Sequence, residues 1–215
     1  MTRTTPVAFF MAALTLTCAT QADIFSHWRF DEASGTTAAD SAGTIDGTLT
    51  GGATFRPGMG VAGGAIELAS ASNSFVNMGN NFNFGNGDAF SLQVWVKTSP
   101  GNSTPLFPVG RHDTGVNRGY LIGINANAGY GRANRAYFYT SDPAGSEANS
   151  TSAVNDGQWH QIVGTFQPGA AARIYVDGAP VETSVNAGNL VQNNAPFMVG
   201  GLLQNGVLRG FYTCL

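Results

Sequence analysis

Alternation of apolar and polar residues constrains this chain more than any other feature of its sequence. The clearest example is Ala89–Lys97, where every second residue from Phe90 to Val96 is apolar and would lie on one face of a strand. No window sustains apolar residues at i, i+3, i+4 and i+7, the spacing that predicts an amphipathic helix. A period of two predicts strands that bury one face, so we expect an all-β fold.

Further short segments with strand character follow along the chain, separated by clusters of Gly, Asn, Asp and Pro. They are Ile24–Phe30, Gly64–Leu68, Phe75–Met78, Leu106–Gly110, Tyr120–Asn125, Ala136–Thr140, Trp159–Phe166, Ala172–Asp177 and Phe197–Gly200. The dipeptides Asp177-Gly178 and Asp156-Gly157 are typical of two-residue hairpin turns, because both central positions need a positive φ. Many short strands without a linker or a repeat predict one antiparallel sandwich of two sheets.

Residues 1–22 are expected to be a secretory signal peptide. Arg3 gives a positive start, Val7–Thr17 is an apolar run, and Thr20-Gln21-Ala22 supplies a small-x-small cleavage pattern. A membrane-spanning helix needs roughly 20 apolar residues, about twice this run. Cleavage would leave residues 23–215 as an exported domain that does not insert into a membrane. Cys214 would be its only cysteine, so no internal disulfide is expected.

The net charge of −3 argues against nucleic acid as a partner. Binding to a phosphate backbone needs a stripe of Lys and Arg, and this chain has no such stripe.

Four ordered sets of residues resemble the laminin G-like jelly-roll domains of the concanavalin A-like lectin/glucanase superfamily. They are Trp28–Asp40 with Asp46–Leu49, Gly64–Leu68 with Phe75–Gly79, Phe90–Lys97, and Asp156–Val163 with Ile174–Gly178. The first set carries an aromatic strand, the turn F-D-E-A-S-G and a downstream D-G-T-L, as the family does. The resemblance implies a concanavalin A-like sandwich of two stacked antiparallel sheets. It also implies that Trp95 and Trp159 cover a sheet and that His160 is a hydrogen-bonded structural residue.

The C-terminal residues depart from the family pattern. The family usually finishes with a strand of the form G-x-I-D-D-V-x-I-Y beside the first strand, and Leu202–Leu215 lacks it. We therefore expect a jelly roll without its last strand, from a truncated or frameshifted gene product. Such a loss would expose the edge of the N-terminal strand and part of the core.

Catalysis by this chain is not expected. Glycoside hydrolysis needs two carboxyl groups across the scissile bond, and the related glucanases place theirs in an E-x-D-x-x-E pattern. No glutamate of the chain begins that pattern, and no G-x-S-x-G nucleophile motif occurs. His27, His112 and His160 are too scattered to indicate a zinc site.

A binding site is the remaining expectation, with calcium as its candidate cofactor. Calcium takes oxygen ligands from loops, and the family tends to place an aspartate ligand in a loop that matches residues 111–118. Asp113 is therefore the first candidate metal ligand, with a turn-capping role as its alternative and Asp31 and Asp40 as other candidates. Arg111 and His112 would contact a ligand beside it.

A second group of candidate ligand-binding residues lies in the segment 130–139, which mixes aromatic, amide and charged side chains. Tyr137 and Tyr139 would share one face of a strand, opposite Ala136 and Phe138, with Arg135 nearby. Such a face can bind a sugar, although a solvated sheet face with amphipathic tyrosines is the alternative.

Three functions remain open on these grounds. The leading one is a secreted, non-catalytic binding or adhesion module for a glycan or an extracellular protein surface, assisted by calcium. The second is a structural accessory domain of a larger surface protein or carbohydrate-active enzyme, of which this chain is a fragment. The third is a polysaccharide-degrading enzyme, disfavoured by the missing carboxylate pattern.

Overall fold

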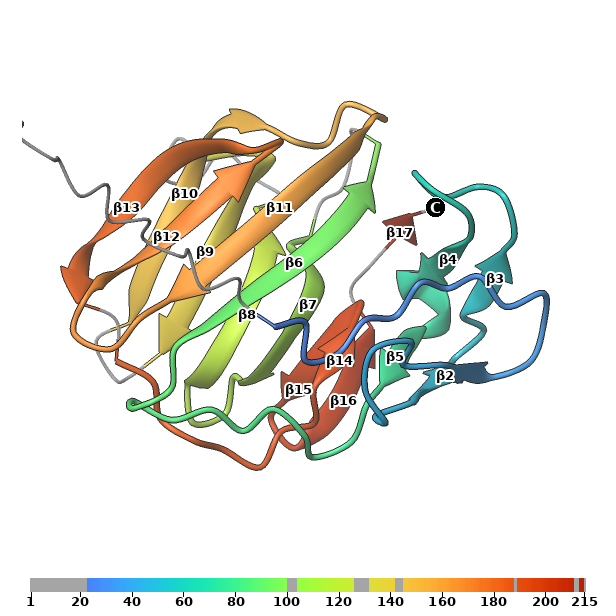
Figure 1. Cartoon of the computed structure of the whole chain (residues 1–215), viewed down its shortest axis with the longest axis horizontal. Helices are drawn as coiled ribbons and strands as arrows, with labels where there is room; N and C mark the ends of the chain where they lie inside the picture. The colour runs from blue at the N-terminus through green and yellow to red at the C-terminus, as the bar shows by residue number, and fades with distance from the viewer. Residues whose placement is uncertain are drawn as a thin grey trace, which may run out of the picture.

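Strands stacked in two layers make up the fold of this computed structural model (Figure 1). The structure describes residues 23–99, 104–125, 132–141, 145–187, 189–210 and 213–214. The helical structure within these ranges is one short 3-10 turn, Ser70–Ser72. None of the described segments forms a helix long and apolar enough to cross a membrane.

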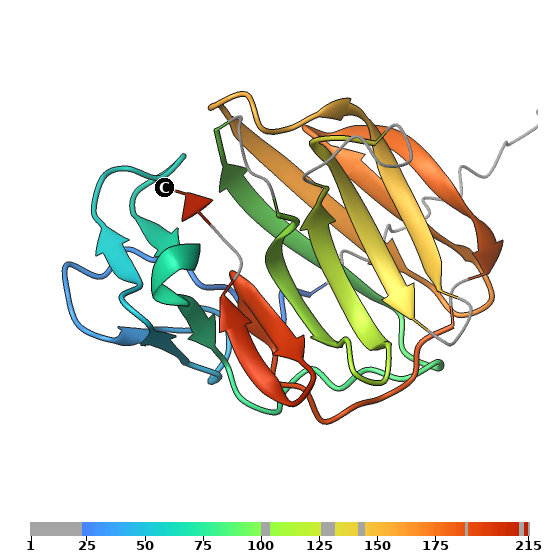
Figure 2. The ribbon, with the colours of Figure 1, turned by 180° about the vertical axis from the view of Figure 1, so that it is seen from behind.

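The larger layer, nearer the viewer in Figure 2, is a ten-stranded sheet. Eight of its strands follow the order β1-β2-β5-β14-β7-β8-β9-β10, and β15 pairs with β16 and with β7. Their bounds are β1 Thr37–Ala38, β2 Gly47–Thr50, β5 Phe75–Asn77, β14 Met198–Val199, β7 Leu106–Asp113, β8 Arg118–Ile124, β9 Arg135–Ser141, β10 Ser146–Ala153, β15 Gly201–Gln204 and β16 Val207–Gly210.

The facing layer contains two smaller sheets. One is four-stranded in the order β13-β12-β11-β6, and the other is three-stranded in the order β17-β4-β3. Their bounds are β13 Ala179–Ala187, β12 Ala171–Val176, β11 Trp159–Phe166, β6 Phe90–Lys97, β17 Thr213–Cys214, β4 Ala65–Ala69 and β3 Thr54–Arg56. Strand β6 therefore forms one edge of the four-stranded sheet.

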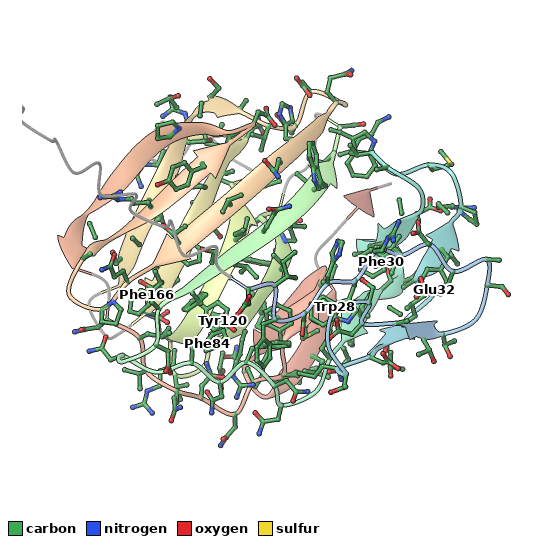
Figure 3. The ribbon with its side chains drawn as sticks, viewed as in Figure 1. Trp28, Phe30, Glu32, Phe84, Tyr120 and Phe166 are labelled. Atoms are coloured by element: carbon green, nitrogen blue, oxygen red, sulfur yellow. The ribbon has the colours of Figure 1, made fainter. Side chains whose placement is uncertain are left out.

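The core lies between the two layers and follows the alternation of the sequence. Phe138 of β9, Ile162 of β11 and Ile174 of β12 are buried there, and along β6 the residues Ser91, Gln93 and Trp95 point away from it. The rings of Phe84, Tyr120 and Phe166 belong to the same interior (Figure 3). The prediction of an all-β antiparallel jelly-roll sandwich is thus confirmed, although the expected second sheet is divided into two smaller sheets.

The two expected hairpin turns have different outcomes. Asp177 and Gly178 have φ values of 52° and 78° and join β12 to β13, as their dipeptide predicts. Asp156-Gly157 does not form a hairpin, because the preceding β10 and the following β11 belong to different sheets. The hairpin prediction was therefore wrong at that position.

The N-terminal segment 23–30 is less regular than its alternation predicts. Its one ladder contact is an isolated bridge between Trp28 and Asp40, so the prediction of a strand over Ile24–Phe30 is wrong. Trp28 is nevertheless fixed, because its indole Nε1 donates to the Ile45 carbonyl oxygen at 2.8 Å and its ring stacks on Phe197.

The C-terminal residues form a hairpin and one short strand. β15 and β16 are joined by Asn205 and Gly206, both with positive φ, and β17 pairs with β4. No strand within the described residues pairs with the outer edge of β6.

Candidate functional site

The outer face of strands β7 to β10 carries a second, smaller hydrophobic cluster. Leu121, Tyr137 and Leu202 are buried in it, with Phe107 and Tyr139 packed against them. It lies on the face of the larger sheet opposite the core, because Phe138, the neighbour of Tyr137 and Tyr139, points into the core. We call this surface the tyrosine face.

A pocket of about 180 Å³ opens on the tyrosine face. Aromatic, aliphatic and polar side chains from five strands and one turn line it: Phe107, His112, Thr114, Leu121, Tyr137, Tyr139, Glu147 and Leu202. A register shift between Leu106 and Val109 in β7 sets which of its residues face outward, so that His112 reaches this pocket.

His112 is the most unusual residue of the pocket. His112 is 5% exposed, and neither of its ring nitrogens has a hydrogen-bond partner among the described residues. Burial lowers the pKa of His112 to about 4, although the nearby Asp113 carboxylate and the Asn117 side chain act in the opposite direction. The imidazole is therefore neutral at pH 7, with one donor and one acceptor nitrogen left unsatisfied.

The rings of Tyr137 and Tyr139 form part of the pocket wall. The Tyr139 ring meets His112 edge-on with centroids 5.6 Å apart, and the Asn117 amide donates to the Tyr139 hydroxyl at 3.1 Å. Tyr137 lies over Gly123, where an added Cβ would overlap its ring. Burial raises the pKa of Tyr137 above its ordinary value, so its hydroxyl stays protonated.

Charged groups lie at the margin of the pocket. The Arg132 guanidinium pairs with the Glu147 carboxylate at 2.7 Å, and Glu147 also lines the cavity. Arg135, at the start of β9, is half-buried and does not line the pocket. Tyr130, which the sequence places near this group, lies outside the described residues.

Arg111 points to the opposite side of the sheet from His112. It is 1% exposed, and its guanidinium donates to the Asn81 and Asn193 carbonyl oxygens and to the Asn80 amide oxygen. Burial lowers the pKa of Arg111. The prediction that Arg111 contacts a ligand beside His112 is therefore wrong. Arg111 instead holds the loops that contain Asn80, Asn81 and Asn193.

The predicted calcium ligand Asp113 caps a turn. Its Oδ1 accepts the backbone N–H of Gly115 at 2.8 Å, which is the alternative role expected for it. Among the described residues, no three His, Cys, Asp or Glu side chains come together as a metal-binding group.

The two other candidate ligands, Asp40 and Asp31, hold the N-terminal turn. Asp40 accepts four backbone N–H groups, those of His27, Ala42, Gly43 and Ile45. Burial acts to raise the pKa of Asp40, but these hydrogen bonds outweigh it and lower the pKa to about 2. Asp31 accepts from the Gly64 N–H at 2.6 Å and pairs with Arg29.

Sequence reasoning found His112, Tyr137 and Tyr139 but missed Phe107, Leu121, Glu147 and Leu202. The alternation of β8 and β9 could have placed Leu121 beside the tyrosines. Phe107 and Leu202 carried no such signal, because the first depends on a bulge and the second on a strand from the C-terminal hairpin. The expected role of His160 is confirmed, since Nδ1 lies 2.8 Å from Asp177 and Nε2 lies 3.1 Å from Asp156.

Curated relatives are similar to part of this chain. Pappalysin-1 of Mus musculus is 29% identical over 136 residues, and that of Homo sapiens is 29% identical over 139 residues. These alignments cover 57% and 58% of this chain but 8% of each pappalysin, so the chain spans a small part of the length of these relatives.

Solved structures share the fold at low sequence identity. Domain 4 of AbnA, a GH43 extracellular arabinanase from Geobacillus stearothermophilus in complex with arabinotriose, has a TM-score of 0.57 and 18% identity, covering 80% of this chain and 82% of that domain. The binding domain of Paraclostridial Mosquitocidal Protein 1 has a TM-score of 0.58 and 15% identity, covering 85% and 46%. The receptor binding domain of botulinum neurotoxin D has a TM-score of 0.55 and 13% identity, covering 86% and 50%.

The family assignment rests on a match across most of the chain. Residues 70–211 match the laminin G-like family described as the concanavalin A-like lectin/glucanases superfamily, and the observed sandwich is the fold expected for it. The chain therefore belongs to the laminin G-like domains of the concanavalin A-like lectin/glucanases superfamily.

Proposed function

We propose that this chain is a secreted, non-catalytic module that binds a glycan through its tyrosine face. The observation that carries the proposal is His112, a neutral, buried histidine with two unpartnered ring nitrogens beside an aromatic pocket. A buried polar group without a partner costs about 1–3 kcal/mol, so a ligand hydroxyl that reaches one of these nitrogens would recover part of that free energy.

Sugar hydroxyl groups match this chemistry. Each hydroxyl can donate and accept, so one hydroxyl of a bound sugar can accept from the protonated imidazole nitrogen of His112 or donate to the other nitrogen. Tyr137 and Tyr139 offer apolar ring surface for sugar C–H groups, and Glu147 adds a carboxylate acceptor. A few placed polar groups on an apolar wall are typical of small-ligand sites.

The structural neighbours support a binding role. One is a domain in complex with arabinotriose, and two others are the binding domain of Paraclostridial Mosquitocidal Protein 1 and the receptor binding domain of botulinum neurotoxin D. The absence of the E-x-D-x-x-E pattern supports a role without catalysis. Pure chain should therefore release no reducing ends from arabinan or other polysaccharides, and release would contradict this part of the proposal.

The direct test is binding of arabinotriose and of an immobilised glycan panel to the full chain. We expect a carbohydrate ligand whose binding falls at least about tenfold in Tyr139→Ala and in His112→Leu, because each removes part of the pocket wall. Tyr175→Ala, on the other layer, is the matched control and should bind as the wild type does. Equal loss in all three variants, or no loss in either pocket variant, would place the glycan elsewhere.

Calcium assistance at Asp113 belongs to the same proposal. The glycan titration is repeated with a chelator and with Asp113→Ala, and both should weaken binding if a loop-bound ion orders the pocket edge. Binding that persists through both treatments would remove calcium and leave the glycan site intact.

A structural accessory domain is the second candidate function. It is favoured by the small share of pappalysin-1 that the alignments cover, since a chain of this size corresponds to one module of a much larger protein. Silence on every glycan and on extracellular protein surfaces would favour it over the binding module.

A further inference from the structure

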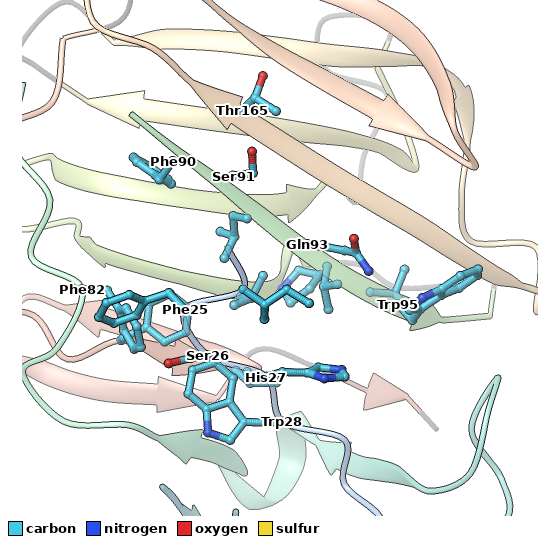
Figure 4. A pocket seen from close by; sticks show the side chains of 18 of the residues that line it. Phe25, Ser26, His27, Trp28, Phe82, Phe90, Ser91, Gln93, Trp95 and Thr165 are labelled. Atoms are coloured by element: carbon cyan, nitrogen blue, oxygen red, sulfur yellow. The ribbon is translucent and has the colours of Figure 1, made fainter. Parts of the chain in front are cut away.

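The molecule holds a second, much larger cavity beside the edge of β6. Its volume is about 1410 Å³, and its walls are all eight residues of β6 on one side and segment 23–30 with part of β4 on the other. Figure 4 shows Phe25 and Trp28 of segment 23–30 beside β6, the strand that carries Gln93 and Trp95. We call this cavity the β6 slot.

One wall of the slot is an unpaired strand edge. Every residue of β6 pairs with β11 on one side, from Phe90 with Phe166 to Lys97 with Trp159. On its other side β6 pairs with no described strand. The N–H and C=O groups along this edge are therefore available to a new strand, which they can pair with in regular register.

The floor of the slot consists of apolar residues that are only partly buried against the hydrophobic core. Eleven partly buried apolar residues pack against the main core, and eight of them line this cavity. The incomplete burial is thus concentrated at one place. Those eight residues are Trp28, Phe30, Ile66, Phe82, Phe84, Phe90, Leu92 and Val94.

The opposite wall of the slot, segment 23–30, is also largely without strand pairing among the described residues. Segment 23–30 makes one isolated bridge, at Trp28, and its residues Ile24 and Phe25 are 69% and 71% exposed. Large apolar side chains at that exposure beside an open strand edge mark a surface that another element can cover.

An extended polypeptide fits this combination better than other ligands. A helix satisfies its own backbone and would leave the β6 edge unpaired, whereas a glycan would place hydroxyl groups against Leu92 and Val94 without partners. An added strand pairs with β6 and turns alternate side chains to the floor. Eight residues at about 3.3 Å each would span β6.

The charged residues that line the slot indicate which polar side chains such a strand would carry. Its ionised lining residues are Arg29, Lys97 and Arg173 against one carboxylate, Asp23, although the whole chain has a net charge of −3. Arg29 pairs with Asp31, while Lys97 and Arg173 form no ion pair with a described residue. Acidic side chains would complement these cations.

We propose that the β6 slot binds an extended segment of a partner polypeptide as an added strand, with apolar residues facing the core and acidic residues near Lys97. The site is separate from the tyrosine face. The proposal therefore stands whether or not the chain binds a glycan.

The test uses the three tryptophans, Trp28, Trp95 and Trp159, which all line the slot. The full chain is titrated with an eight-residue peptide that alternates Val or Ile with Asp or Thr and contains no tryptophan. We expect saturable change in tryptophan emission and a higher melting temperature. The same composition with its apolar residues in one block, and the alternating peptide with N-methylated amides, should each bind at least about tenfold more weakly. Equal binding of the three peptides, or binding of none, would overturn the proposal.

Two valine exchanges provide a matched pair of variants. Val94→Thr places a hydroxyl on the slot floor and should weaken peptide binding about tenfold, whereas Val163→Thr, on the outer face of β11 and outside the slot lining, should leave it unchanged. The change Lys97→Gln should weaken binding of the acidic peptide and spare its Asn-containing counterpart. Peptide binding that none of these changes affects would contradict the assignment to the slot. Melting curves of each variant without peptide show whether it is folded.

A second copy of this chain is the competing occupant. Sedimentation of the full chain over a range of concentrations should show a monomer that binds one peptide. A dimer that the alternating peptide dissociates would assign the slot to a second copy and overturn the proposal. Arabinotriose binding, measured with the slot filled, should be unchanged because the two sites lie on different layers.

Discussion

Two histidines show how burial and hydrogen-bond partners decide the charge of the same side chain. His112 is buried without a partner, and its pKa falls to about 4. Burial would also lower the pKa of His160, but the Asp177 and Asp156 carboxylates outweigh this and raise it. At neutral pH His112 is a neutral group suited to a polar ligand, whereas His160 is held by hydrogen bonds between two carboxylates.

Adjacent residues also acquire unrelated roles. The sequence grouped Arg111 with His112 as ligand contacts, but neighbours on a strand point to opposite faces. Arg111 therefore fixes loops beneath the sheet while His112 lines the pocket above it. Alternation alone predicts that they separate. Which of the two faces outward depends on the β7 bulge, which the sequence did not reveal.

His112 gives the chain a defined pH dependence of stability. Because its pKa is about 4 in the fold and 6.5 ordinarily, the unfolded chain binds a proton between these values and the folded chain does not. The free energy of unfolding should fall by about 3 kcal/mol from this group as the pH drops from 6.5 to 4. Urea unfolding at several pH values measures this.

The variant His112→Leu isolates the effect. It should unfold with a weaker pH dependence over that interval, while Tyr175→Leu, on the other layer, keeps the wild-type dependence. A His112→Leu protein that loses stability with falling pH as the wild type does would assign the dependence to other groups.

At the scale of elements, β8 and β9 fit together by pairing a glycine with a tyrosine. Gly123 lies beneath the Tyr137 ring, and the two residues are partners in the ladder. This close approach leaves no room for a Cβ, so the glycine shapes the wall of the pocket. A glycine inside a strand is typical of a place where another group approaches the backbone closely. That this group is the Tyr137 ring follows only from the strand register.

Strand β10 shows where pattern reasoning fails. Its sequence, Ser146–Ala153, is small and polar and carries no apolar alternation, so no strand was predicted there. It forms because β9 pairs with it at the edge of the larger sheet, and its Ala148 and Ser150 are nearly fully buried. Tertiary pairing overrides weak local preference in such a segment.

Adding a methyl group under Tyr137 tests the role of Gly123. Gly123→Ala should displace the ring, cost about 1–3 kcal/mol of stability by overpacking, and weaken any glycan that binds the tyrosine face. Urea unfolding and the glycan titration measure the two effects. Gly87→Ala is the control, since no atom lies within 4 Å of its added Cβ, and it should change neither quantity. Wild-type behaviour of Gly123→Ala would show that the ring is free to move.

At the scale of the whole molecule, the two layers are closed at one end and open at the other. Strands β11 to β13 complete the core over β8 to β10, while the β6 slot leaves apolar side chains only partly covered. An open edge above an apolar floor favours association with other chains. The free energy of unfolding should therefore depend mainly on the core covered by β11 to β13, and aggregation on the residues that line the β6 slot.

Removing one exposed ring beside the slot tests this. Phe25→Ser should slow irreversible aggregation of the otherwise monomeric protein on heating, because Phe25 is 71% exposed next to the β6 edge, with only a small change in the free energy of unfolding. Val116→Ser removes another exposed apolar side chain away from the slot and should leave the aggregation rate unchanged. Light scattering gives the rates. An equal effect of both exchanges would show that general surface hydrophobicity, and not the slot, drives aggregation.

The sequence by itself determined the fold class, the alternation of β6 and β9, the turn at Asp177-Gly178 and the shared face of Tyr137 and Tyr139. Each of these depends on neighbouring residues, whose periodicity and turn chemistry act locally. Only the tertiary structure decided the outward turn of His112, the addition of Phe107 and Leu202 to its pocket, and the slot beside β6. Those features depend on a bulge and on pairing between residues far apart in the sequence, which local pattern does not encode.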